Sequence, residues 1–212
     1  MKWVFFGVLG VILLVILRKF VIRRRAAAGG SGWAGGDSGS RTGAAIAAAK
    51  VGDDVEMEGV GERFEHVHFT IDRRSRYEAG GATWYEVSGT QRGERVYVEL
   101  YEDDDLEVTV QLPAAALSLD DLGLTEKDLA RMDDERNPKN TVAYNGETWS
   151  YASSEEISYS KDGKSPLEGY YSWEFESADG HRVLFVEKWE GEPFEAGIVH
   201  RVHAEDIRVS PR

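Results

Sequence analysis

The chain has 212 residues, of which 42% are hydrophobic and 30% charged, and its formal net charge is −13. This composition is too apolar for a wholly disordered chain and leaves room for one or two domains. The absence of cysteine excludes a disulfide scaffold, a thiol nucleophile and a thiolate metal site.

Charge is distributed unevenly along the chain. Residues 1–25 contain six basic and no acidic side chains, so the remaining residues carry 19 basic and 38 acidic ones, a net charge of −19. A surface of this charge repels phosphate backbones. We therefore expect no nucleic-acid binding by the rest of the chain.

The first apolar stretch predicts a transmembrane helix. Residues 3–17 contain no charged or strongly polar side chain. Residues 3–22 can span the hydrocarbon core of a bilayer if the basic side chains within and after them reach the headgroups. These membrane-flanking residues are Arg18, Lys19, Arg23, Arg24 and Arg25. We therefore expect residues 1–25 to be an anchor that contacts the lipid bilayer through residues 3–22.

The basic residues also determine the expected orientation. They follow the apolar run, whereas a cleaved signal peptide, which is the alternative, carries its positive charge before the run. Basic flanking residues stay on the cytoplasmic side of a membrane. The sequence thus predicts a single-pass protein with its N-terminus outside and its C-terminal domain in the cytoplasm.

Residues 26–50 are rich in Gly, Ala and Ser. Such a stretch buries too little apolar surface to offset the entropy cost of ordering it. We predict a flexible linker here, with a short helical turn near its end, at residues 44–50.

From residue 51 onward apolar and polar side chains alternate, as they do in half-buried strands. We expect short strands of this kind at residues 95–100, 106–112, 142–149, 171–175, 182–189, 198–202 and 207–209. Asn145-Gly146 is typical of a two-residue hairpin turn. The pattern predicts a mainly β domain over residues 51–212, built as an antiparallel sandwich or a barrel-like sheet.

One helical insertion interrupts the strands. Thr125 and Asp128 have the spacing of a capping box, Leu129 and Met132 supply an apolar face, and Pro138 ends the helix. We expect residues 113–139 to be a helical connector that covers a sheet edge or the end of a core, or links two lobes.

The body also resembles itself. Residues 83–108 and 172–196 each contain a strand with tryptophan, a glycine-marked turn and a strand that ends in Glu-x-aromatic-Glu. This similarity favours two related β units, at about residues 51–112 and 140–209, that face each other. The alternative is that any two β-meanders look alike.

Four stretches carry a further resemblance: KVGDDVEMEG, RYEAGGATWYEV, VYVELYEDDDLEV and WEFESADGHRVLFVEKWEGEPFEA. Together they resemble the bacterial family of domains of unknown function numbered 4178, over about residues 50–210. The resemblance implies a bacterial domain of unassigned activity that is associated with membrane and envelope-stress systems. It assigns no functional residues. With the anchor, it implies a location in the bacterial inner membrane.

Three groups of side chains are candidates for chemistry. His66 and His68 share a strand face, as zinc ligands can, and residues 102–105 offer four carboxylates for calcium. Glu99 and Glu187 occupy matching positions in the two units, and convergent carboxylates are the machinery of glycosidases. Solvated histidines, a solvated hairpin tip and outward-facing strand glutamates are the simpler interpretations. We therefore predict no catalytic residue, no metal site and no cofactor.

Aromatic residues are numerous for a body of this size. Tyr101 and Trp189 lie opposite the aliphatic side chains of their own strands. With Trp84 and Trp173 they are the candidate lining of a groove for a partner. The alternative is a second core layer between two sheets.

These features favour a non-enzymatic binding or scaffolding module that an anchor and a tether hold at the membrane, next to a protein partner. The alternative is an enzyme or sensor that acts on a small molecule or sugar in the groove between the two β units. Ligand-induced thermal stabilisation would distinguish them.

Overall fold

The computed structural model describes residues 45–60, 65–102 and 106–212. By its internal contacts the chain divides into two units, and all described residues except 80–82 belong to the unit of residues 37–79 and 83–212. This unit is mainly antiparallel β-sheet with few helices, which confirms the predicted all-β class. The predicted anchor, its flanking basic residues and most of the predicted linker lie outside the described residues. Within those residues, no helix is long and apolar enough to cross a membrane.

Strands form two successive groups along the described residues. The first group is β1 (Asp54–Val60), β2 (Glu65–Ala79), β3 (Ala82–Gln91), β4 (Glu94–Glu102) and β5 (Leu106–Gln111). The helix α3 (Glu126–Glu135) follows. The second group is β6 (Thr141–Tyr144), β7 (Glu147–Ser160), β8 (Glu168–Ser177), β9 (Arg182–Trp189) and β10 (Phe194–Val202), after which η1 (Ala204–Asp206) leads to β11 (Ile207–Ser210).

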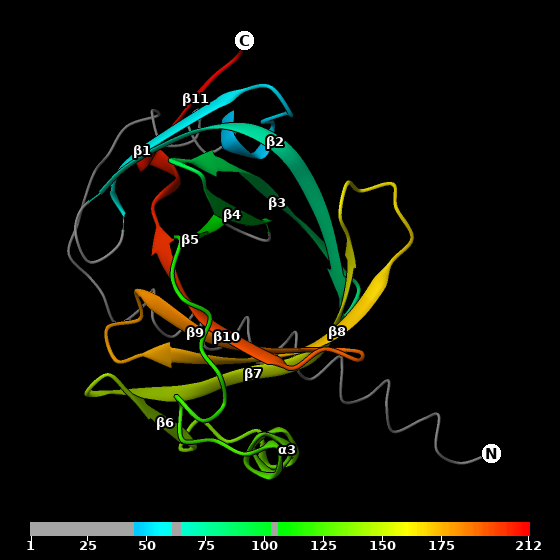
Figure 1. The fold of residues 1–212 in the computed structure, drawn as a ribbon, viewed down its shortest axis with the longest axis vertical. Helices are drawn as coiled ribbons and strands as arrows, with labels where there is room; N and C mark the ends of the chain where they lie inside the picture. Colours follow the sequence, from blue (N-terminus) through cyan, green and yellow to red (C-terminus); the bar gives the residue numbers. More distant parts are fainter. Residues whose placement is uncertain (1–44, 61–64, 103–105) are drawn as a thin grey trace. The chain divides into compact units, whose positions relative to one another are not determined.

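Eight of these strands close into a ring, in the order β2-β3-β4-β5-β10-β9-β8-β7 (Figure 1). Two ladders between the groups close it: residues 76–78 of β2 pair with residues 158–160 of β7, and residues 108–110 of β5 pair with residues 200–202 of β10. We call these ladders the two seams. Of the two arrangements that the sequence left open, the ring is the barrel-like one.

Local sequence explains several of these elements. Burial alternates along β4 and β5 with the period of two that their sequences predict. The predicted hairpin joins β6 to β7, where Tyr144 pairs with Glu147 around a two-residue turn. Asn145 and Gly146 both have positive φ, at 51° and 77°, as a type I′ turn requires.

The first strand group encloses one apolar cluster. Val55, Phe69, Val87 and Val98 lie in it, contributed by β1, β2, β3 and β4. Ile46 and Ala49 are buried in the same cluster, at 0% and 1% exposed. The structure therefore places the last residues of the predicted linker within the packed body.

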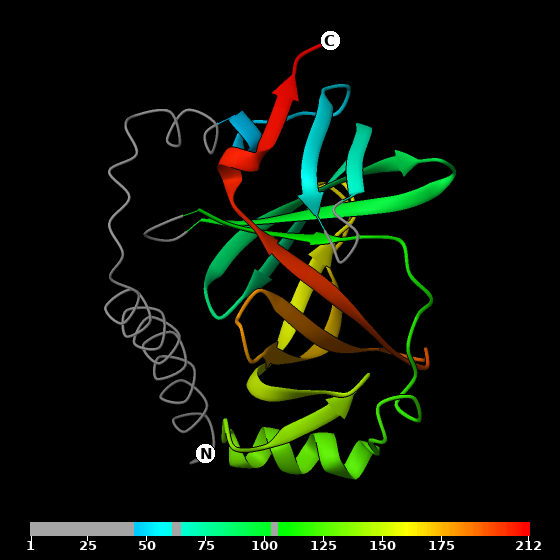
Figure 2. The same cartoon turned by 90° about the vertical axis from the view of Figure 1, so that its left-hand side faces the viewer.

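The second strand group forms another apolar cluster, which α3 covers (Figure 2). Leu129 and Met132 of α3 are buried in it, beside Phe175 of β8 and Leu184 of β9. The helical insertion thus covers the core of the second group of strands.

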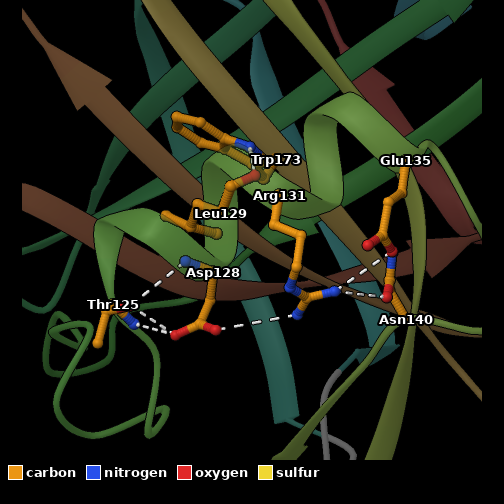
Figure 3. A network of polar contacts seen from close by, with 7 residues as sticks. All are labelled: Thr125, Asp128, Leu129, Arg131, Glu135, Asn140 and Trp173. Atoms are coloured by element: carbon orange, nitrogen blue, oxygen red, sulfur yellow. Dashed lines mark hydrogen bonds and ion pairs between the residues drawn. The ribbon is translucent and has the colours of Figure 1, made fainter.

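The predicted cap of α3 is present. The Thr125 Oγ1 accepts from the Asp128 backbone N–H at 3.3 Å, and the Asp128 carboxylate accepts from the Thr125 N–H at 3.0 Å (Figure 3). The indole N–H of Trp173 donates to the Leu129 carbonyl at 3.2 Å. This bond ties the helix to β8 and places Trp173 in the second apolar cluster.

The ring strands also have faces that point away from both apolar clusters, and glutamates lie on these faces. On β3, Val87 faces the first cluster, so its neighbour Glu86 faces the opposite way. On β9, Val186 faces the second cluster, so Glu187 faces the opposite way. Trp84, two residues before Glu86, and Trp189, two residues after Glu187, lie on these same faces and pack in one cluster, although they come from different strand groups. These faces are therefore turned toward each other, and we call them the inner face of the ring.

Candidate functional site

Six aromatic residues gather on the inner face beside the seam between β2 and β7. We call them the aromatic cluster: Tyr77, Trp84, Tyr101, Tyr159, Tyr170 and Trp189. Tyr77 and Tyr159 are directly paired across the seam, and their ring centroids lie 5.1 Å apart. Trp84 stacks on Tyr77 at 5.7 Å, and Tyr170 stacks on Trp189 at 4.3 Å.

Exposure differs within the aromatic cluster. Tyr77, Trp84 and Tyr170 are buried, at 8%, 6% and 7% exposed. Tyr101 and Trp189 are only partly buried. The cluster therefore has a buried interior and a side that solvent reaches.

Glu86 lies beside the buried part of the cluster and is 8% exposed. Its carboxylate accepts a hydrogen bond from the Tyr77 hydroxyl at 2.9 Å and one from the Ser75 hydroxyl at 3.3 Å. The Arg73 guanidinium lies 3.8 Å away. Burial raises the pKa of Glu86, and the contacts with Tyr77, Arg73 and Ser75 oppose that rise.

Glu187 lies beside the partly exposed part of the cluster. The indole N–H of Trp189 donates to its carboxylate at 3.1 Å. The pKa of Glu187 is raised to about 7, mainly by burial and also by the negative charges of Glu195, Glu86 and Glu174, against the opposing effect of the Trp189 bond. This carboxyl therefore exchanges its proton near neutral pH.

Glu99, the other half of the predicted carboxylate pair, lies on the same inner face. It is directly opposite Glu86 in the β3–β4 ladder. Burial is the largest of the causes that raise the pKa of Tyr170 well above its ordinary value, and the charges of Glu187 and Glu99 are the next two. Both predicted carboxylates thus act on one buried hydroxyl.

The structure brings together three of the four predicted groove residues. Tyr101, Trp189 and Trp84 belong to the aromatic cluster, whereas Trp173 lies in the second apolar cluster and bonds to α3. The indole N–H of Trp84 is buried and has no acceptor among the described residues. Buried polar groups normally have a partner, so this donor calls for an explanation.

Neither of the two candidate histidines belongs to the aromatic cluster. His66 and His68 lie exposed on β2, and His66 is 3.4 Å from Glu56. Within the described ranges, no group of three or more His, Cys, Asp or Glu side chains is arranged to hold a metal ion. Three of the four residues of the predicted acidic turn, 103–105, lie outside those ranges.

The comparison with protein families agrees with the sequence resemblance. A family model described as Domain of unknown function (DUF4178) matches residues 59–204. The chain belongs to this family. The match includes all eight ring strands and the whole aromatic cluster. Neither a curated protein nor a solved structure matches the chain significantly.

Sequence reasoning missed two central residues of this DUF4178 domain, Glu86 and Tyr77. Neither residue stood out as a candidate in the sequence. The one signal was the spacing of two residues between Trp84 and Glu86, which places an indole and a carboxylate on one strand face. Their burial depends on β7 and β8, which follow more than 60 residues later in the chain.

The inner face of the DUF4178 domain thus offers two kinds of chemistry. Its carboxylates are held in surroundings that disfavour their charged form, so they bind a proton or a cation more readily than solvated ones do. Its partly exposed aromatic rings supply flat apolar surface for a small molecule.

Proposed function

We propose that this chain is a binding module that takes up a small molecule at the inner face of its strand ring. One observation carries the proposal: the aromatic cluster lies against a buried and a half-buried carboxylate, Glu86 and Glu187, both with raised pKa values. Ligand sites are mostly apolar surfaces with a few placed polar groups, and shifted pKa values concentrate at functional sites.

The cost of this arrangement also supports a binding role. An interior built for stability alone would pack apolar side chains, as the two apolar clusters do, because burying carboxylates destabilises a fold. Glu86 needs Tyr77, Ser75 and Arg73 to offset its burial. Such a network is explained by a function for the buried groups better than by stability.

We further propose that residues 3–22 anchor the module in a bacterial inner membrane, with the ring in the cytoplasm. The support is the sequence: six basic and no acidic residues in 1–25, and a net charge of −19 beyond them. A C-terminal alkaline phosphatase fusion would be inactive in this orientation, and an active fusion would contradict it. A protein partner and a link to envelope stress stay predictions.

Thermal unfolding of the full-length protein tests the binding function. In detergent, a panel of cationic, anionic and neutral small molecules should include a class that raises the unfolding temperature, because a ligand stabilises the state that binds it. The shift should disappear in Trp189→Leu and persist in Tyr85→Leu, which removes an aromatic ring on the opposite face of β3. The proposal fails if no compound stabilises the wild type, or if both variants respond like it.

Acid–base catalysis on a small molecule or sugar is the second candidate, and the pKa of about 7 at Glu187 favours it. A catalytic site would convert a stabilising compound into a product during incubation, and Glu187→Gln would abolish the conversion. Recovery of every stabilising compound unchanged would leave binding as the function.

A further inference from the structure

We infer that the ligand of the inner face is an organic cation, an alkylated or protonated amine that also carries an oxygen acceptor. The inference rests on the proposed function, because it names the class of ligand for the same site. Three features of the described residues support it: the charges around Glu187, the rings beside them and the unpartnered indole of Trp84.

The charges around Glu187 are negative. Glu195 is its direct partner in the β9–β10 ladder, and Glu195, Glu86 and Glu174 all raise its pKa. Among the described residues Glu187 forms no ion pair. A bound cation would relieve this repulsion, whereas a bound anion would increase it.

Aromatic rings lie beside this negative charge. Trp189 stacks on Tyr170 at 4.3 Å and donates to Glu187 at 3.1 Å, so its indole is held against the carboxylate. The faces of aromatic rings attract cations, and tryptophan attracts them most strongly. A carboxylate next to partly exposed rings suits an alkylated amine, whose charge is spread over an apolar surface.

A metal ion suits this place less well. Metal ions need several ligands that converge on one point. Within the part of the chain that the structure describes, no three His, Cys, Asp or Glu side chains converge in this way. The cation that fits is therefore one recognised by charge and ring faces together.

The unpartnered indole of Trp84 indicates the second feature of the ligand, an oxygen acceptor. Trp84 is 6% exposed, and its N–H has no acceptor among the described residues. Trp84 contacts Tyr101 edge-on, with ring centroids 6.0 Å apart, and so lies next to the partly exposed side of the cluster. A hydroxyl or carbonyl oxygen on the ligand would satisfy this donor.

Isothermal titration of the full-length protein in detergent at pH 8 tests the inference with three probes. Choline has the cation and the hydroxyl, tetramethylammonium has only the cation, and 3,3-dimethylbutan-1-ol is the uncharged analogue of choline. We expect choline to bind saturably at one site and the uncharged analogue to bind at least about tenfold more weakly. Tetramethylammonium should lie between them.

Substitutions test which side chain recognises the cation of choline and which recognises its hydroxyl group. Glu187→Gln should weaken choline binding about tenfold, whereas Glu190→Gln, the same change at an exposed position three residues after Glu187, should leave it unchanged. Trp84→Phe should remove the advantage of choline over tetramethylammonium. Unfolding temperatures no lower than that of the wild type would show that each variant is folded.

The outcomes separate this inference from the proposed function. Equal binding of choline and its uncharged analogue would overturn the cationic class, while binding to the inner face would stand. Failure of all three probes would also overturn the class, and the thermal panel would then decide the binding function by itself. Choline binding that Glu187→Gln leaves intact would show that the cation binds elsewhere.

Discussion

Glu187 is the residue at which pH acts most directly on this domain. Its pKa is 4.5 in an unfolded chain and about 7 in the fold, so the folded state holds the proton more tightly. This carboxyl therefore favours folding below pH 4.5, and the advantage is lost as the pH rises from 4.5 to 7. The groups that face it, Glu195, Glu86 and Glu174, are carboxylates that act in the same direction.

Glu187→Gln keeps the shape of the side chain and removes its charge. We expect the variant to raise the free energy of unfolding by about 1–3 kcal/mol at pH 8 and to change it little at pH 4.5. Urea unfolding at both pH values measures the difference. Glu190→Gln is the exposed control, and an equal effect of Glu187→Gln at both pH values would contradict the assigned burial.

Residue roles were only partly visible in the sequence. Glu99 and Glu187 stood out because each precedes an aromatic residue by two positions, and both lie on the inner face. The sequence repeat suggested that Trp84 and Trp173 hold matching positions, but the strand pairing differs. Glu86 pairs with Glu99, and Ser172 pairs with Glu187, so Ser172 holds the place in the second group that Glu86 holds in the first. Two residues earlier on each strand, the counterpart of Trp84 is therefore Tyr170. Trp173 is displaced by an odd number of residues and faces the other way.

At the scale of elements, the packing of β2 over β3 depends on one glycine. A Cβ atom at Gly89 would lie 2.2 Å from the Thr70 carbonyl oxygen and 2.4 Å from Phe69. Because backbone must move to make room, Gly89→Ala should destabilise the fold by about 3 kcal/mol. Gly169→Ala is the matched control, since its Cβ would meet only Glu156 Oε1 at 3.7 Å. Comparable unfolding midpoints for the two variants would refute this account of the β2–β3 packing.

The cap of α3 supports a smaller prediction. Thr125→Ala removes the acceptor for the Asp128 N–H and should cost about 1 kcal/mol in chemical denaturation. Thr125→Ser keeps the hydroxyl and should behave like the wild type. A serine variant as unstable as the alanine variant would show that the methyl group, and not the cap, matters.

Elements with local causes could be predicted, and those with distant causes could not. The capping box of α3, the Asn145-Gly146 turn and the alternation in β4 and β5 depend on neighbouring residues. The seams join segments 80 or more residues apart, for which no local pattern exists. The burial of Ile46 and Ala49 likewise depends on strands that follow them.

At the scale of the whole domain, the two related β units stay a prediction that the seams support. Each seam pairs strands that hold the same place in their groups: β2 with β7, and β5 with β10. The first ladder is centred on a matched pair, Tyr77 and Tyr159. A duplicated unit that pairs with its copy about a twofold axis would give this pattern.

The central claim is that an organic cation binds to the inner face, and the indole N–H signals of the tryptophans test it most directly. Each signal in a nitrogen-15 spectrum can be assigned by a Trp→Phe variant. Adding choline should move the signals of Trp84 and Trp189 and leave those of Trp149 and Trp173, which lie in the second apolar cluster. Trp149 is a stringent control, because its indole N–H is also buried without an acceptor in the described residues. Shifts confined to Trp149 and Trp173, or no shift at saturating choline, would contradict the account.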